Sequence, residues 1–120
     1  MKKVMVVDDD LDLREMTETM VKKEGYLTAT AENGQEFLQQ VEQFSPDVVV
    51  LDVMMPGLST KEILERLSKS AVQPKIILFT AILYSEEEKE KIRKRWNVVE
   101  YLQKPFDADQ LLDAIHQHTQ

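Results

Sequence analysis

The sequence Val4-Met5-Val6-Val7-Asp8-Asp9-Asp10 joins a short apolar run to three consecutive carboxylates. A second apolar run, 48–51, leads in the same way into Asp52. Apolar runs of this length are typical of strands in a parallel sheet, which is buried on both faces. Because the carboxyl ends of parallel strands meet at one edge, we expect these carboxylates to converge there. Like charges held that close favour a proton or a cation among them, and a hard divalent ion suits such oxygen ligands.

Strand and helix patterns alternate from one end of the chain to the other. Strands are predicted at about 3–8, 26–31, 47–51, 75–80 and 98–102, and helices at about 11–24, 35–44, 60–69, 85–96 and after the Lys104-Pro105 pair. Such alternation predicts an α/β fold in which βα units wind into a single doubly wound parallel sheet. The second strand is the more polar one, and we expect it at an edge of the sheet.

The first predicted helix has an apolar stripe and a clear end. Its buried face should consist of Leu13, Met16, Met20 and Val21, and Gly25 should terminate it. Of the carboxylates before and within its first turn, Asp10 or Asp12 is better explained as a helix N-cap than as a ligand.

The fourth predicted helix is highly charged. Ser85 and Glu88 have the spacing of a capping box at its start. Two favourably oriented i,i+4 ion pairs are expected along it, Glu87/Lys91 and Glu90/Lys94.

Length and composition indicate one compact domain over residues 1–120, with no cysteine and a net charge of −7. That charge disfavours direct nucleic-acid binding, which relies on a basic surface, so the expected partners are proteins. No apolar stretch approaches the roughly 20 residues that span a bilayer, and the N-terminus lacks the pattern of a signal peptide. We therefore expect a cytoplasmic protein without membrane contact.

Five polar side chains follow or end the predicted strands: Asp8, Asp9, Asp52, Thr80 and Lys104. In open α/β sheets, ligands bind in the crevice at these strand ends. Carboxylates, a hydroxyl, an ammonium group and a bound cation together suit the uptake of a phosphoryl group. That reaction depends mainly on positioning and on charge neutralisation.

Four segments carry a resemblance to a known family across nearly the whole chain. They are Val7-Asp8-Asp9-Asp10, Leu51-Asp52-Val53-Met54-Met55-Pro56-Gly57, Thr80-Ala81 and Tyr101-Leu102-Gln103-Lys104-Pro105-Phe106. In this order and spacing they resemble the receiver domain of bacterial and archaeal two-component response regulators, which includes the chemotaxis receiver. The resemblance implies a flavodoxin-like (βα)5 domain with strand order 2-1-3-4-5, acting as a signalling switch rather than as an enzyme.

The resemblance also implies residue roles. Asp52 would accept the phosphoryl group of a phosphohistidine on a sensor histidine kinase or phosphotransfer protein. Mg²⁺, or Mn²⁺ in its place, would be held by Asp52, by Asp9, by the backbone carbonyl of Met54 and, through a water molecule, by Asp8. Thr80 and Lys104 would each hold a phosphoryl oxygen.

Two further implications concern the switch and the lifetime of the signal. Tyr101 would change rotamer after Thr80, and the Lys104-Pro105 peptide would be cis. In receivers, the second residue after the acceptor and the second after the switch threonine border the path of the attacking water. Here both are apolar, Met54 and Ile82, which predicts slow autodephosphorylation.

The chain departs from the family pattern at Ser59-Thr60, at Trp96-Asn97-Val98 and in the slightly greater length between Thr80 and Lys104. These positions lie near the surfaces that receiver domains use to recognise partners, so the resemblance does not identify the downstream partner. Homodimer formation on phosphorylation is open, as is whether the chain stands alone or belongs to a longer regulator.

Simpler interpretations remain open for single residues. Thr80 can cap the next segment, Lys104 can be a solvated cation, and Tyr101 can pack with its hydroxyl outward. Three other functions also remain: a phosphorylation-independent adaptor, an aspartyl-phosphate phosphohydrolase and a flavin-binding module. The acidic set disfavours the adaptor and an anionic flavin, and Met54 stands where a phosphohydrolase has its second aspartate.

Overall fold

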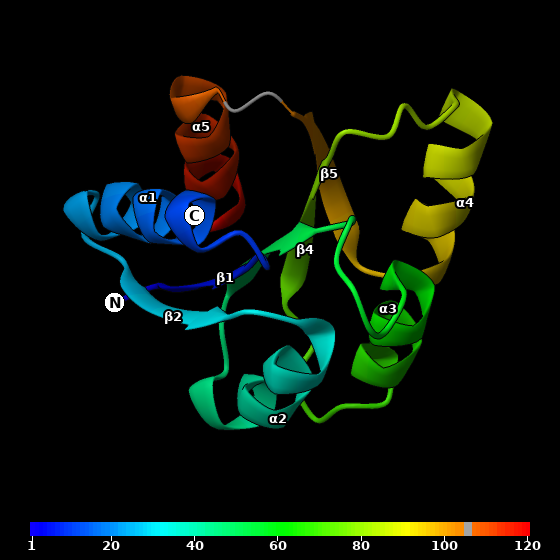
Figure 1. Ribbon diagram of the computed structural model, residues 1–120, viewed down its shortest axis with the longest axis horizontal. Helices are drawn as coiled ribbons and strands as arrows, with labels where there is room; N and C mark the ends of the chain where they lie inside the picture. The colour runs from blue at the N-terminus through cyan, green and yellow to red at the C-terminus, as the bar shows by residue number, and fades with distance from the viewer. Residues whose placement is uncertain (105–106) are drawn as a thin grey trace.

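The computed structural model describes residues 1–104 and 107–120, and its five strands form one parallel sheet. The strand order is β2-β1-β3-β4-β5, which confirms the predicted topology (Figure 1). The strands are β1 (Lys3–Val7), β2 (Leu27–Ala31), β3 (Val48–Asp52), β4 (Lys75–Thr80) and β5 (Val98–Gln103). Each lies within one or two residues of its predicted bounds.

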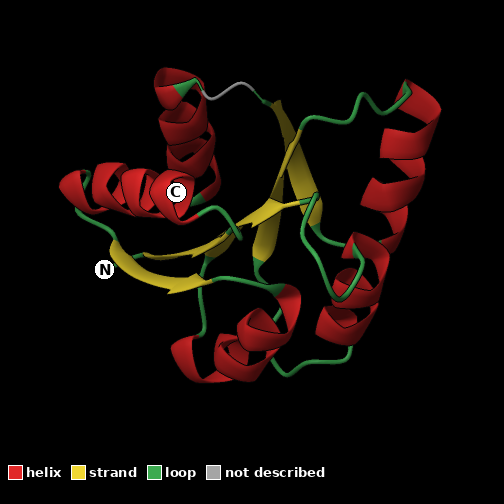
Figure 2. Ribbon diagram, viewed as in Figure 1, coloured by secondary structure: helices red, strands yellow, loops and turns green. Residues whose placement is uncertain are grey.

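In the described residues four helices connect the strands and a fifth follows β5, and together they cover both faces of the sheet (Figure 2). They are α1 (Leu11–Lys23), α2 (Gly34–Phe44), α3 (Thr60–Ser68), α4 (Glu86–Arg95) and α5 (Ala108–His118). Two clusters of buried side chains make up the core. One joins the sheet to α2 and α3, and the other joins it to α1 and α5.

The central strands are buried because their sequences are apolar on both faces. In β1, Met5 and Val7 belong to the cluster under α2 and α3, whereas Val4 belongs to the cluster under α1 and α5. The strand β2, with the sequence LTATA, lies at an edge as expected, and its first residue, Leu27, is exposed. Alternate side chains of a strand therefore point to opposite faces of the sheet and contribute to different core clusters.

Polar caps fix where the helices start. Asp10 is the N-cap of α1, and its side chain accepts a hydrogen bond from the amide of Leu13 at 3.1 Å. The predicted capping box of Ser85 and Glu88 is present at the start of α4. A second capping box, which the sequence interpretation did not identify, starts α3. These caps satisfy amides that the first helical turn leaves without partners.

Two local predictions need correction. Met16 was expected on the buried face of α1 but is 49% exposed, and Thr17 is buried in its place. The hydroxyl of Thr17 donates to the carbonyl of Leu13 at 2.7 Å, which removes the cost of burying it. On α4 the pair Glu87–Lys91 is present at 3.5 Å, whereas Glu90 pairs with Arg93, three residues away, instead of Lys94.

The predicted cis peptide at Lys104-Pro105 involves residues outside the described part of the chain. No helix in the described ranges is both long and apolar enough to cross a membrane.

Candidate functional site

The predicted site residues meet at the carboxyl edge of the sheet. Asp8 follows β1, Asp52 ends β3, Thr80 ends β4, and Lys104 follows β5. The parallel register pairs Asp52 with Phe79, and the backbone amide of Lys104 donates to the carbonyl of Thr80 at 2.8 Å. The strand ends therefore lie side by side in the order that brings these four residues together.

Three carboxylates form the centre of the site. Oxygen atoms of Asp8, Asp9 and Asp52 lie within 4.8 Å of one another. Asp8 and Asp52 are buried, whereas Asp9 is exposed at the entrance. This combination of closely spaced oxygens and one solvent-facing carboxylate fits a hard divalent cation that keeps some of its waters.

Asp52 is held in place from two sides. Its Oδ1 accepts a hydrogen bond from the backbone amide of Met54 at 3.2 Å and lies 3.1 Å from Nζ of Lys104. Nζ of Lys104 also lies 5.2 Å from the centre of the Phe79 ring. Because an unpaired buried carboxylate is costly, the ammonium group is the main compensation for the charge of Asp52 in the described structure.

Asp8 carries the clearest electrostatic signal of the site. Burial, together with the neighbouring charge of Asp52, raises its pKa from 3.8 to about 6. A hydrogen bond from the amide of Asp10 at 3.0 Å and the ammonium group of Lys104 at 4.0 Å offset part of that rise. The cluster therefore holds more negative charge than Lys104 neutralises, which favours a further cation.

Thr80 is buried, and its hydroxyl oxygen accepts a hydrogen bond from the backbone amide of Ile82 at 2.8 Å. This bond fixes the start of the loop between β4 and α4. Within residues 1–104 and 107–120 the hydroxyl donates no hydrogen bond, so its proton is available to another acceptor. Thr80 therefore caps the next segment through its hydroxyl oxygen, as the simpler interpretation has it, while its hydroxyl group can still donate a hydrogen bond to a ligand.

The two positions expected to control the lifetime of the phosphoryl group are both exposed. Met54 is 60% exposed and Ile82 is 40% exposed. Their backbone amides bind the side chains of Asp52 and Thr80, so each residue is fixed beside the site through its main chain.

Tyr101 connects β5 to α4. Its hydroxyl donates to the carbonyl of Lys89 at 3.3 Å, and the cationic groups of Lys89 and Arg93 lie 5.5 and 5.3 Å from its ring centre. The ring of Tyr84 approaches edge-on at 5.6 Å. Burial raises the pKa of Tyr101 to about 12, so its hydroxyl keeps its proton. The side chain therefore does more than pack with its hydroxyl in solvent.

Sequence reasoning missed two contributors to the site. The guanidinium group of Arg14 donates to the backbone carbonyl of Asp8 at 2.8 Å, which anchors the end of β1 to α1. Phe79 lies directly before Thr80 and pairs with Asp52 in the sheet. In the sequence, the signal for Phe79 was its place directly before Thr80. The sequence offered no signal for Arg14 beyond its place in the first predicted helix.

Comparison with known proteins agrees with this geometry. Residues 4–116 match the family model of the response regulator receiver domain. The chain belongs to the response regulator receiver domain family. Receiver domains are phosphoacceptor signalling modules rather than classical enzymes, and the acidic pocket of Asp8, Asp9 and Asp52 is typical of them.

Three relatives illustrate the match. The chain is 33% identical to sporulation initiation phosphotransferase F of Bacillus subtilis over 98% of this chain and 93% of that protein. It is 31% identical to the chemotaxis protein CheY of Listeria monocytogenes over 96% of each. Its structure resembles response regulator TrrA of Thermotoga maritima, solved in complex with Mg²⁺-BeF, with a TM-score of 0.80, 36% identity and coverage of 98% and 99%.

Proposed function

We propose that this receiver accepts a phosphoryl group on Asp52 from a phosphohistidine of a sensor histidine kinase or a histidine phosphotransfer protein. The observation that carries the proposal is the position of the Asp52 carboxylate. It ends a buried central strand, is oriented by the amide of Met54, and lies beside both an acidic cluster and the ammonium group of Lys104.

In the proposed reaction, a carboxylate oxygen of Asp52 attacks the phosphorus atom of the phosphohistidine. A new oxygen–phosphorus bond forms as the nitrogen–phosphorus bond breaks, and the bonding electron pair leaves with the imidazole of the donor. Lys104 releases Asp52 and pairs with a phosphoryl oxygen, while the hydroxyl group of Thr80 donates a hydrogen bond to another phosphoryl oxygen. Both groups neutralise charge in the transition state, where positioning counts most.

The residues of the acidic pocket fit a Mg²⁺ ion. We infer that Asp9, Asp52 and the backbone carbonyl of Met54 would hold it, with Asp8 acting through water and with Mn²⁺ as a substitute. When bound, the ion would supply positive charge to the phosphoryl oxygens. Support comes from the spacing of the three carboxylates and from the Mg²⁺-BeF complex of the relative TrrA.

Thr80 and Tyr101 would transmit the change to the surface. If the hydroxyl of Thr80 turns toward a phosphoryl group, its hydrogen bond with the amide of Ile82 is disturbed, and the loop that precedes α4 is free to shift. Tyr101 holds α4 through the carbonyl of Lys89, so a change of its rotamer would alter how that helix is held. The downstream partner, and a homodimer formed on phosphorylation, remain to be identified. We infer a cytoplasmic location, because the proposed phosphodonors act inside the cell.

The proposal is tested by intact-mass spectrometry after incubation with acetyl phosphate and Mg²⁺. The parent should gain one phosphoryl adduct that hydroxylamine removes, and either Asp52→Asn or a chelator should abolish it. Asp113→Asn is the matched control, because Asp113 is an exposed carboxylate on α5. A stoichiometric adduct on Asp52→Asn would show that Asp52 is not the acceptor.

A further inference from the structure

The charge of the chain is unevenly distributed. Residues 61–95, from α3 to the end of α4, contain nine Lys and Arg against six Asp and Glu. The rest of the chain contains six against sixteen. One region of an acidic protein is therefore net positive, and a negatively charged partner would be attracted to that region while the remaining surface repels it.

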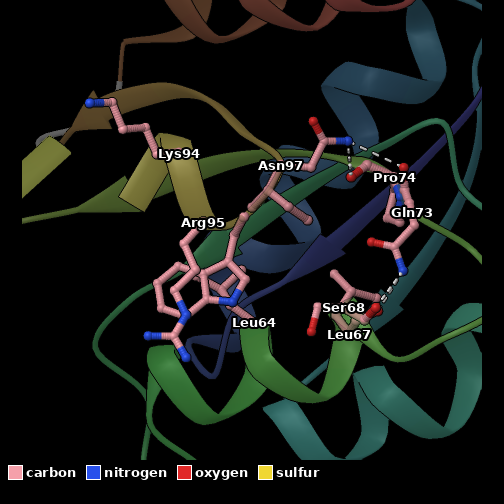
Figure 3. A pocket seen from close by; sticks show the side chains of 10 residues that line it. Leu64, Leu67, Ser68, Gln73, Pro74, Lys94, Arg95 and Asn97 are labelled. Carbon is pink, nitrogen blue, oxygen red and sulfur yellow. Dashed lines mark hydrogen bonds between the residues drawn. The ribbon is translucent and has the colours of Figure 1, made fainter. Parts of the chain in front are cut away.

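Within this region a cleft of about 270 Å³ lies between α3 and the end of α4 (Figure 3). Its floor is apolar and consists of Leu64, Leu67 and Ile76, which are all buried. The partly exposed indole ring of Trp96 forms one wall. The cleft is smaller than most sites for cofactors or metabolites, and its volume suits a single apolar side chain.

Two amide side chains fix the walls of the cleft. Nδ2 of Asn97 donates to the carbonyls of Gln73 and Pro74 at 3.3 and 3.0 Å, as Figure 3 shows. Nε2 of Gln73 donates to the carbonyls of Leu67 and Ser68 at 2.9 and 3.2 Å. These bonds tie the loop before β5 to the loop before β4 and to the end of α3. The cleft is therefore preformed, which lowers the ordering cost of binding.

The rim of the cleft carries one cation whose charge is not neutralised. The guanidinium group of Arg95 lies 5.0 Å from the Trp96 ring centre and forms an ion pair with Glu65. Lys94, in contrast, makes no ion pair or hydrogen bond within residues 1–104 and 107–120, and its side chain extends away from the cleft in Figure 3. A chain that leaves the cleft across this rim would meet the Lys94 ammonium group.

We propose that this cleft and Lys94 form a docking surface for an acidic peptide segment of a partner protein. One aliphatic side chain of the segment would occupy the apolar floor beside Trp96, and its flanking carboxylates would lie near Lys94. A buried apolar anchor with a charged rim is the usual form of such sites. The surface lies at the amino ends of β4 and β5, at the sheet edge opposite the acidic pocket, so both sites can be occupied together.

The chain contains one tryptophan, so its fluorescence reports on this cleft directly. The probe is a synthetic peptide, acetyl-Asp-Glu-Leu-Leu-Glu-Asp-amide, titrated into the full chain, with a peptide carrying Lys at the four acidic positions as the comparison. The acidic peptide should change the emission of Trp96 and shift the side-chain amide resonances of Gln73 and Asn97. Lys94→Glu should weaken its binding by about fivefold to tenfold. Ser68→Leu, which fills the cleft from α3, should weaken it as well.

Lys23→Glu is the matched control, because Lys23 is exposed on α1 and the substitution changes the charge equally. The proposal is overturned if the acidic peptide produces no response at millimolar concentration, or if Lys94→Glu and Lys23→Glu bind it equally. It is also overturned if Trp96 emission changes with protein concentration alone as dimers form, or if a single-stranded DNA oligonucleotide binds the cleft more tightly than the peptide. Asp52→Asn should bind the peptide like the parent, so failure here leaves the phosphorylation proposal intact.

Discussion

Replacing Asp8 by Asn should stabilise the metal-free protein at pH 8. The buried carboxylate of Asp8 lies among the oxygens of Asp9 and Asp52, and its pKa is raised from 3.8 to about 6. A folded state that binds the proton more tightly than the unfolded state loses stability as the pH rises through this window. Above pH 6 the charged form bears the full penalty, which Asn avoids.

The size of the effect follows from the same two values. The difference between 3.8 and about 6 corresponds to about 3 kcal/mol without screening. Solvent at the exposed Asp9 screens the cluster, so we expect Asp8→Asn to raise the free energy of unfolding at pH 8 by about 1–2 kcal/mol. Asn retains an oxygen that can accept the hydrogen bond that the Asp10 amide donates to Asp8.

Urea denaturation of the parent and of Asp8→Asn in EDTA, at pH 8 and at pH 4.5, measures this effect. The free energy of unfolding of the variant should exceed that of the parent at pH 8, and the difference should shrink at pH 4.5. Asp113→Asn, an exposed change on α5, should alter stability by no more than about 0.5 kcal/mol. Equal stabilities of parent and Asp8→Asn at pH 8 would refute the electrostatic reasoning.

Four further outcomes are expected. Mg²⁺ at about a hundredfold its Kd should raise the free energy of unfolding of the parent by about 2.7 kcal/mol, and that of Asp9→Asn by less. Thermal melts with and without Mg²⁺ measure this, and equal shifts of the melting temperature in both proteins would argue against a site at these carboxylates. Lys104→Ala removes the ion pair with Asp52 and should slow phosphoryl uptake from acetyl phosphate on the order of 10²-fold without unfolding the domain. An unchanged rate of uptake would mean that the role of Lys104 is misassigned. Met54→Asn combined with Ile82→Glu should shorten the phosphoryl lifetime by supplying polar groups to orient water, whereas a parent lifetime of seconds would contradict the prediction of slow loss. Tyr101→Phe should lower the free energy of unfolding by about 0.5–1 kcal/mol through loss of the bond to the Lys89 carbonyl, and unchanged stability would argue that this bond contributes nothing.

The strands, and the convergence of polar side chains at their carboxyl ends, were predictable because both depend on local sequence. An apolar run such as 48–51 can only be buried on both faces, and the residue that follows it must then lie at the sheet edge. The resemblance supplied the strand order, which the alternation of elements alone leaves open. Residue spacing could not decide which carboxylate of the acidic run is buried; in the structure it is Asp8, whose backbone amide still pairs with the carbonyl of Ala31 on β2.

The errors come from interactions between elements. The buried residues of α1 are Thr17 and Val21, and Met16 is exposed, because residue spacing alone did not decide which of the adjacent positions 16 and 17 faces the sheet. The contact of Tyr101 with Lys89 depends on how α4 lies across β5, which no local pattern encodes. The hydrogen bond from Arg14 to the carbonyl of Asp8 likewise depends on how α1 lies beside the end of β1, which no local pattern encodes.

The most direct test of the central claim is to locate the phosphoryl group. After phosphorylation with acetyl phosphate and Mg²⁺, borohydride reduction converts an aspartyl phosphate to homoserine, and peptide mapping by mass spectrometry then identifies the residue. We predict homoserine at position 52 alone, in the segment that follows Val48-Val49-Val50-Leu51. Homoserine at any other aspartate, or none in a protein that has gained a labile adduct, would contradict the account.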